Sequence, residues 1–175
     1  MTNKNVCKYI VLRKGTTGRS EQMATVDTVE VKQDWGFEAF NAEIGASTGS
    51  VLRVGSLTNF LPEDVKAGHG IKSVDMWIDD EGRMSSDAVV NEYATVLTSQ
   101  LVYGDCVLFT TDHEGNSSPL KNDVLANVLS VLSKMMHDPK VAEAVAVIKK
   151  LDKDWVDKHG LMSISFDSED GVTNV

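Results

Sequence analysis

Two acidic segments, each closed by a glycine, are the places in this sequence where side chains of one chemical type gather. Asp79-Asp80-Glu81-Gly82 and Asp112-His113-Glu114-Gly115 both follow apolar runs. Carboxylate oxygens bind calcium and magnesium, but a calcium loop needs them at alternate positions with a closing bidentate glutamate. Neither segment has that pattern, whereas an aspartate that bonds its own backbone, before a glycine with positive φ, makes a tight turn. We interpret both segments as turns and predict no metal site.

Other patterns of catalytic chemistry are missing from the sequence. The four histidines show no pair at zinc-binding spacing and no partnering cysteine pair: His69, His113, His137 and His159. The glycine-rich Gly15–Ser20 lacks the lysine and the spacing of a phosphate-binding loop. We therefore predict no catalytic residue and no cofactor. We expect the protein not to be an enzyme, and a hydrolase is the least favoured function.

The negative charge of the protein is concentrated in one segment. Residues 73–120 contain nine aspartates and glutamates with Arg83 as their single basic residue, and the net charge of the whole chain is −9. Such a surface disfavours direct contact with nucleic acid and favours a basic partner. The first hypothesis is a non-catalytic protein that binds a partner with a basic surface. The predicted contact residues are Asp75, Asp79, Asp80, Glu81, Asp112 and Glu114.

A small-ligand binder, for example one that sequesters a nucleotide, is the alternative hypothesis. Gly15–Ser20 and Gly45–Gly55 could offer backbone amides to an anion. Lys14, Arg19 and Arg53 lie in or beside these glycine-rich segments and would supply positive charge. The simpler interpretation of the first segment is a hairpin turn.

Length and composition limit the class of protein. With 175 residues, 42% of them hydrophobic, the chain is long enough to bury a core without disulfides. Cys7 and Cys106 lie in apolar, strand-like runs, and the first residues lack the apolar stretch of a secretory signal. The sequence contains no run of about eighteen apolar residues, so we predict no membrane span. We expect a cytoplasmic protein, and the sequence leaves open whether it forms a homo-oligomer.

Alternation and turn residues predict the elements that position these groups. Met23–Lys32 alternates with a period of two and follows the strand-like Val6–Arg13, which indicates a hairpin. Asp34 precedes a helical spacing that ends at Gly45, and Ala88–Gln100 has the spacing of another helix. Further strands are predicted at Ser50–Gly55, Val74–Ile78 and Asp105–Thr111, with Leu57–Gly70 irregular apart from one helical turn. This order indicates an α+β fold with a mixed or mostly antiparallel sheet.

The last third of the sequence has helical periodicity. Residues 122–137 carry a wide apolar stripe, and Asp138-Pro139 caps a second helix that ends at Gly160. Because the link is short, we predict an antiparallel helical hairpin packed on the core. The apolar residues from Val141 to Trp155 either pack on that core or meet a partner. The predicted divisions are a core domain at 1–120, the hairpin with a terminal strand (161–166) at 121–166, and an acidic tail at 167–175.

Three motifs, in this order and spacing, resemble a domain-of-unknown-function family found in phages, plasmids and bacteria. They are Trp77–Met84 with its acidic-glycine turn, Asn91–Thr95 and Gly104–Leu108, and the resemblance covers roughly residues 6–120. It implies a phage or mobile-element accessory protein that acts on a host macromolecule in the host cytoplasm, in host takeover or counter-defence. It brings no established catalytic residues. If the family has a polar site, Asn91 and Thr95 are its candidates; otherwise they are a helix cap and an interior hydroxyl.

Overall fold

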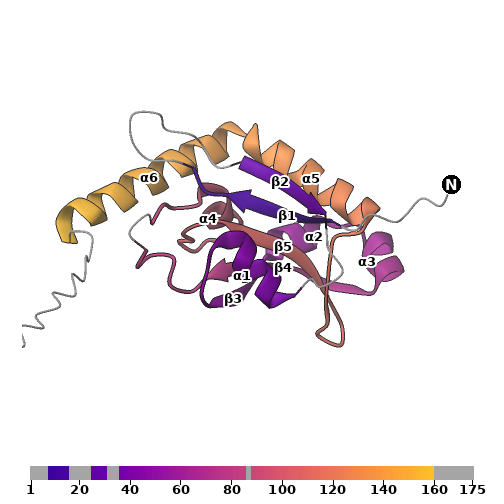
Figure 1. Cartoon of the computed structure of the whole chain (residues 1–175). Coiled ribbons are helices and arrows are strands. Elements are labelled where there is room, and N and C mark those ends of the chain that lie inside the picture. Colours follow the sequence, from indigo (N-terminus) through magenta and orange to yellow (C-terminus); the bar gives the residue numbers. More distant parts are fainter. Residues whose placement is uncertain (1–7, 16–24, 31–35, 86–87, 160–175) are drawn as a thin grey trace, which may run out of the picture.

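Among the described residues, six strands form one sheet in which every pairing is antiparallel (Figure 1). The computed structural model describes residues 8–15, 25–30, 36–85 and 88–159. The strands are β1 (Lys8–Arg13), β2 (Thr25–Glu30), β3 (Gly49–Arg53), β4 (Ile71–Asp79), β5 (Cys106–Asp112) and β6 (Ser117–Ser118). Five of them lie in the order β2-β1-β5-β4-β3, and β6 pairs with β5. The predicted α+β class and mostly antiparallel sheet are confirmed.

Six helices accompany the sheet within the described ranges. They are α1 (Phe37–Ile44), α2 (Gly55–Phe60), α3 (Glu63–His69), α4 (Glu92–Thr98), α5 (Asn122–Met136) and α6 (Pro139–His159). The segment read from the sequence as mostly irregular, Leu57–Gly70, therefore contains most of α2 and all of α3. Its few apolar residues hid the periodicity. The helix predicted at Ala88–Gln100 is shorter because Asn91 caps it and Val90 instead forms a bridge with Tyr103.

The alternation of side chains along the strands builds two separate apolar clusters. Ile10 and Leu12 point to one face of the sheet, and Tyr9 and Val11 point to the other. The first face is covered by α2, α4 and α5, which contribute Leu57, Ala94, Leu97, Val124, Val128 and Leu132. The second is covered by α1, whose Phe40 packs with Tyr9, Trp77 and Phe109. The larger cluster, which includes α5, thus lies on the first face.

Helix α1 is fixed over the second face by an aromatic contact and a hydrogen bond. Phe37 stacks on Trp77 with ring centroids 4.4 Å apart, and the Trp77 indole donates to Asn41 Oδ1 at 2.8 Å. The indole also covers Gly49 on β3, where a Cβ atom would lie 2.5 Å from the ring. A side chain at position 49 would therefore displace Trp77.

Helices α5 and α6 follow one another end to end rather than folding back, so the predicted antiparallel hairpin is wrong in its geometry (Figure 1). Only His137 and Asp138 separate them, and two residues that continue helical hydrogen bonding are too few to reverse the chain. Asp138 starts α6 by accepting a hydrogen bond from the Lys140 amide at 2.9 Å. The predicted terminal strand and acidic tail lie outside the described residues.

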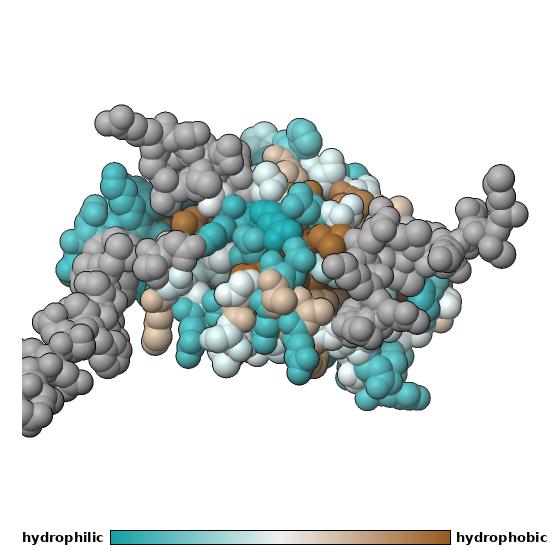
Figure 2. Space-filling view, viewed as in Figure 1, coloured by the Kyte–Doolittle hydropathy of each residue, from teal (hydrophilic) through white to brown (hydrophobic). Residues whose placement is uncertain are grey.

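The face of the protein shown in Figure 2 is largely hydrophilic, with hydrophobic residues visible in separate spots. Among the described residues, no helix is both long and apolar enough to cross a membrane.

Candidate functional site

The two acidic turns lie at opposite ends of the sheet. Asp79, at the end of β4, pairs with Gly49, whereas Asp112 pairs with Ile71 at the start of β4. The length of β4 therefore separates them by roughly 25 Å, at about 3.3 Å per residue. The acidic residues of the two turns are close in sequence, but they do not form one continuous contact surface.

Both segments have the hydrogen bonds of turns. The Glu81 amide donates to Asp79 Oδ1 at 3.0 Å, and the Glu114 amide donates to Asp112 Oδ1 at 2.9 Å. Hydrogen bonds from Asn116 to the Asp112 carboxylate are the main reason that its pKa is lowered. Asp80, Glu81 and Glu114 are exposed, so they stay accessible to a partner.

Asp75 is buried, which removes it from the predicted contact surface. Its exposed fraction is 4%, and it lies on β4, which has a strand on either side in the sheet. Its Oδ2 accepts hydrogen bonds from Ser73 Oγ at 2.9 Å and Thr111 Oγ1 at 2.5 Å. Its Oδ1 lies 3.7 Å from Arg53 Nε, so the structure brings together two residues from different hypotheses. Their contact is an ion pair within the fold.

Asn91 and Thr95 hold α4 in place. Asn91 caps the helix by accepting from the Ala94 amide, and its Nδ2 donates to the carbonyls of Leu12 and Gly104, both at 2.9 Å. Thr95 Oγ1 accepts from the Val102 amide at 3.0 Å. Because Asn91 is fully buried with all its polar atoms engaged, the interpretation of these residues as a cap and an interior hydroxyl is confirmed.

The three basic residues of the ligand hypothesis are not gathered into one site. Lys14 follows β1 and its amide donates to Asp105 Oδ1 at 2.8 Å, whereas Arg53 ends β3, with β5 and β4 between the two strands. Arg19 lies outside the described residues. Among the described residues, Lys14 and Arg53 do not come together, so they do not form one binding site for a nucleotide.

Arg13 forms an ion-pair cluster that the sequence did not reveal. Its guanidinium contacts Asp27 on β2, Glu43 on α1 and Asp105 before β5. Partial burial opposes its charge, but the hydrogen bonds that the guanidinium donates to the three carboxylates, Glu43 first, raise the pKa of Arg13 above its ordinary value. The cluster ties three segments to β1, and the residues are too scattered in sequence to be recognised as a group.

Histidines and cysteines form no reactive set among the described residues. His69 Nε2 lies 2.7 Å from Asp123 Oδ2, and His137 Nδ1 lies 2.7 Å from the Ser133 carbonyl. The Cys106 thiol is buried, and burial raises its pKa, which disfavours the reactive thiolate. The ranges that the structure describes contain no group of three acidic, histidine or cysteine side chains able to hold a metal ion.

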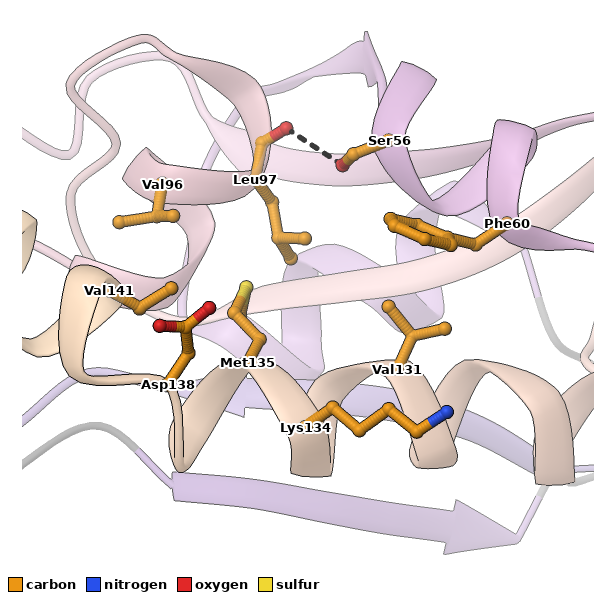
Figure 3. Close-up of a pocket in the computed structure, with 9 residues that line it drawn as sticks. All are labelled: Ser56, Phe60, Val96, Leu97, Val131, Lys134, Met135, Asp138 and Val141. Carbon is orange, nitrogen blue, oxygen red and sulfur yellow. Dashed lines mark hydrogen bonds between the residues drawn. The ribbon is translucent and has the colours of Figure 1, made fainter.

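An apolar groove lies between four helices of the described structure. Its volume is about 350 Å³, and its walls come from α2, α4, α5 and the start of α6 (Figure 3). In Figure 3, Phe60 approaches from one side, Leu97 and Val96 from above, and Val131 and Met135 from α5 below. The lining residues are Ser56, Phe60, Val96, Leu97, Val131, Lys134, Met135, Asp138 and Val141.

The groove is apolar with one charge of each sign beside it. Lys134 and Asp138 lie one helical turn apart along one wall, and the Ser56 hydroxyl is engaged within the protein, because its Oγ donates to the Leu97 carbonyl at 3.3 Å. Phe60 at the rim is 66% exposed. A large aromatic side chain held in water beside an apolar groove is the feature expected of a contact surface.

The wall formed by α6 depends on polar contacts to the body of the protein. Lys149 Nζ lies 2.9 Å from Oε1 of Glu92, which is buried on α4. Tyr103 OH donates to Asp152 Oδ1 at 2.9 Å, and burial together with this carboxylate raises the pKa of Tyr103 to about 12. The first contact holds α6 against α4, and the second holds it against the segment between α4 and β5.

Comparisons with known proteins give no further guide, since the chain matches no family model, no curated protein and no solved structure. The resemblance to a phage and plasmid family therefore stays a prediction. The function has to be inferred from the geometry of this groove.

Sequence reasoning missed the groove, although part of its signal was present. The apolar stripe of α5 includes Val131 and Met135, which are only partly buried against the core and also line the groove. The other wall has no such signal, because α2 has no clear periodicity in the sequence and nothing local distinguishes the end-to-end course of α5 and α6 from a hairpin.

Proposed function

We propose that this protein is a binding protein that takes an amphipathic helix of a protein partner into the groove between α2, α4, α5 and α6. The observation that carries the proposal is the 350 Å³ apolar groove with the exposed Phe60 at its rim. Grooves between helices accept apolar side chains spaced one turn apart on a partner helix. No catalytic step is assigned to the groove.

The charges beside the groove specify the partner further. Lys134 and Asp138 are four residues apart, so they lie on the same side of their wall. A partner helix that places an acid and a base one turn apart, beside its apolar residues, would pair with both in one orientation. Such pairs add little affinity at a surface but fix orientation.

The proposal keeps the predicted non-catalytic, protein-binding role and moves its site. The exposed acidic turns, Asp79–Glu81 and Asp112–Glu114, would act only as separate secondary contacts for a basic partner. That the partner belongs to the host of a phage or mobile element is a prediction from the sequence resemblance. Sequestering of a nucleotide is not supported, because Lys14, Arg53, Asn91 and Thr95 all lie outside the groove.

Photo-crosslinking from the rim of the groove tests the proposal. Phe60 is replaced by benzoylphenylalanine, and Met84, which is 84% exposed and does not line the groove, is replaced in the same way as a control. We expect a discrete protein adduct from position 60 that is lost when Val131→Glu places a charge in the groove. The unfolding midpoint of Val131→Glu is measured alongside, and Asp138→Asn, which keeps a capping side chain, serves as a second groove variant.

Two outcomes would contradict the proposal. One is that position 60 gives no adduct beyond those of position 84. The other is that the adduct persists in a folded Val131→Glu protein, since the partner would then contact Phe60 without entering the groove.

A further inference from the structure

The wall of the groove and the exposed face of α6 carry the same sequence pattern. On α5 and the link that follows it, the pattern is Val131-x-x-Lys134-Met135-x-x-Asp138. On α6 it is Val147-x-x-Lys150-Leu151-x-x-Asp154. The first set lines the groove, and all four residues of the second are exposed, with Val147 at 53% and Leu151 at 61%. We call the second set the α6 face.

This pattern is complementary to itself when two helices pack antiparallel. Residues three and four apart lie on one face of a helix, so each set presents two apolar side chains flanked by a lysine and an aspartate. In the antiparallel orientation, Lys134 meets Asp154 and Asp138 meets Lys150. The apolar residues of the α6 face then enter the groove near Met135 and Val141. In the parallel orientation lysine meets lysine, which is unfavourable.

The α6 face cannot reach the groove of its own chain. Asp138 is both a groove residue and the cap of α6, and α6 leads away from α5 (Figure 1). Val147 lies eight residues beyond Pro139, which is about 12 Å along a helix that rises about 1.5 Å per residue. The face that matches the groove is therefore available only to another molecule.

We infer that the partner helix of the groove is α6 of a second copy of this chain. This inference rests on the proposed function, since it names the occupant of the same groove. Ala144 lies midway in sequence between Lys134 and Asp154, and also midway between Asp138 and Lys150. One two-fold axis near Ala144 thus generates both contacts, with each copy placing its α6 face in the other's groove. This is the closed, isologous arrangement that most homodimers have.

Sedimentation velocity of the purified chain over a hundredfold range of concentration tests the inference. We expect a monomer at low concentration and a dimer at high concentration, because the contact is partly polar and limited in extent. Leu151→Glu should remove the dimer without affecting folding, since residue 151 is exposed. Met84→Glu, the same change of an exposed apolar residue to glutamate at a position outside α6 and outside the groove, is the matched control and should leave the dimer intact.

Charge reversal tests the antiparallel pairing itself. Lys134→Glu and Asp154→Lys should each weaken the dimer about tenfold or less, as expected of exposed ion pairs, and the two together should restore it. A chain that stays monomeric at all concentrations overturns the inference. A dimer that persists in Leu151→Glu, or that the double reversal does not restore, also overturns it.

Failure of the inference is distinguishable from failure of the proposed function. In the photo-crosslinking experiment, an adduct of twice the mass of the chain supports the second copy as occupant. An adduct with a different protein, lost in Val131→Glu, supports the groove and overturns the inference. The absence of any groove-dependent adduct overturns both.

Discussion

Helices α5 and α6 follow one another along the chain, carry a similar pattern of apolar and charged residues, and are held in quite different ways. Helix α5 buries Val124, Val128 and Leu132 almost completely against the sheet. Helix α6 buries only Val145 among its described side chains and depends on the Lys149–Glu92 and Asp152–Tyr103 contacts. The difference arises because α5 lies across the sheet, whereas α6 continues beyond the elements it could cover.

The comparison shows that an amphipathic pattern does not by itself specify what a helix covers. Val147 and Leu151 are spaced like core residues but have no described side chain over them. A helix docked by apolar burial and a helix docked by a few polar contacts should respond differently to mutation and pH.

Removing a buried side chain from α5 should have the largest effect. Leu132→Ala deletes a side chain that is 1% exposed within the larger cluster, so the free energy of unfolding should fall by about 2–5 kcal/mol. The matched change on α6, Leu151→Ala, should alter it by no more than about 0.5 kcal/mol, since its side chain is exposed. Urea unfolding at protein concentrations where the chain is monomeric measures both. Equal losses would mean that the α6 face is covered within one chain.

Removing the ammonium group that faces Glu92 should have an intermediate effect. Lys149→Met leaves the Glu92 carboxylate buried without its partner, while Lys149 itself is partly exposed and screened by water. We expect a loss of about 1–3 kcal/mol, which is below the cost of breaking a fully buried ion pair. Adding Glu92→Gln should recover part of the loss, because a neutral amide is less costly to bury.

The two variants also show where the loss occurs. Hydrogen exchange should increase in α6 and α4 but not in the central strands if the ion pair holds α6 alone. Uniformly faster exchange throughout the sheet would indicate that α6 and α5 unfold as one unit, which would break the distinction between them.

The Tyr103–Asp152 contact should make the packing of α6 against the body of the protein sensitive to alkaline pH. Burial and the Asp152 carboxylate raise the pKa of Tyr103 from 10.0 to about 12. A pKa that is higher in the folded state means that the contact stabilises fully below pH 10 and that this contribution is lost as the pH rises towards 12. Tyrosinate absorbance of the native protein against Tyr103→Phe isolates this residue. Asp152→Asn should lower the pKa, because it removes the negative charge beside the phenol.

The same variant gives a measure of the hydrogen bond at neutral pH. Tyr103→Phe should lower the free energy of unfolding by about 1 kcal/mol, the usual net value of one hydrogen bond. A Tyr103 that ionises at its ordinary pKa in the folded protein would show that Asp152 and α6 are not held against it.

The features of this fold that the sequence predicted are those that depend on neighbouring residues. The strands in the middle of the sheet were predicted because the apolar run of Val74–Ile78 and the β-branched content of Asp105–Thr111 are local properties. The cap at Asn91 was also readable, since capping depends on the next three residues. The α+β class followed from the order of these elements.

Features that depend on tertiary contacts were not readable. Nothing near Asp75 in sequence indicates that Ser73 and Thr111 enclose its carboxylate, so it was assigned to the surface. The acidic turns are close in sequence but lie at opposite ends of β4. The groove requires α2, α4 and α5 to meet, and no local pattern contains that information.

The smallest expected effect concerns a charge contact on α5. His69 lies beside Asp123 in the first turn of α5, and this contact is the main reason that the pKa of Asp123 is lowered from 3.8. A pKa that is lower in the folded state contributes stability that is present above the ordinary pKa and lost as the pH falls through the folded value. Because Asp123 is exposed, Asp123→Asn should hardly change unfolding at neutral pH. An NMR titration should show the Asp123 carboxyl moving to a higher pKa in His69→Gln. If that change instead loosens α5, then this helix also depends on polar contacts, and the contrast with α6 would not hold.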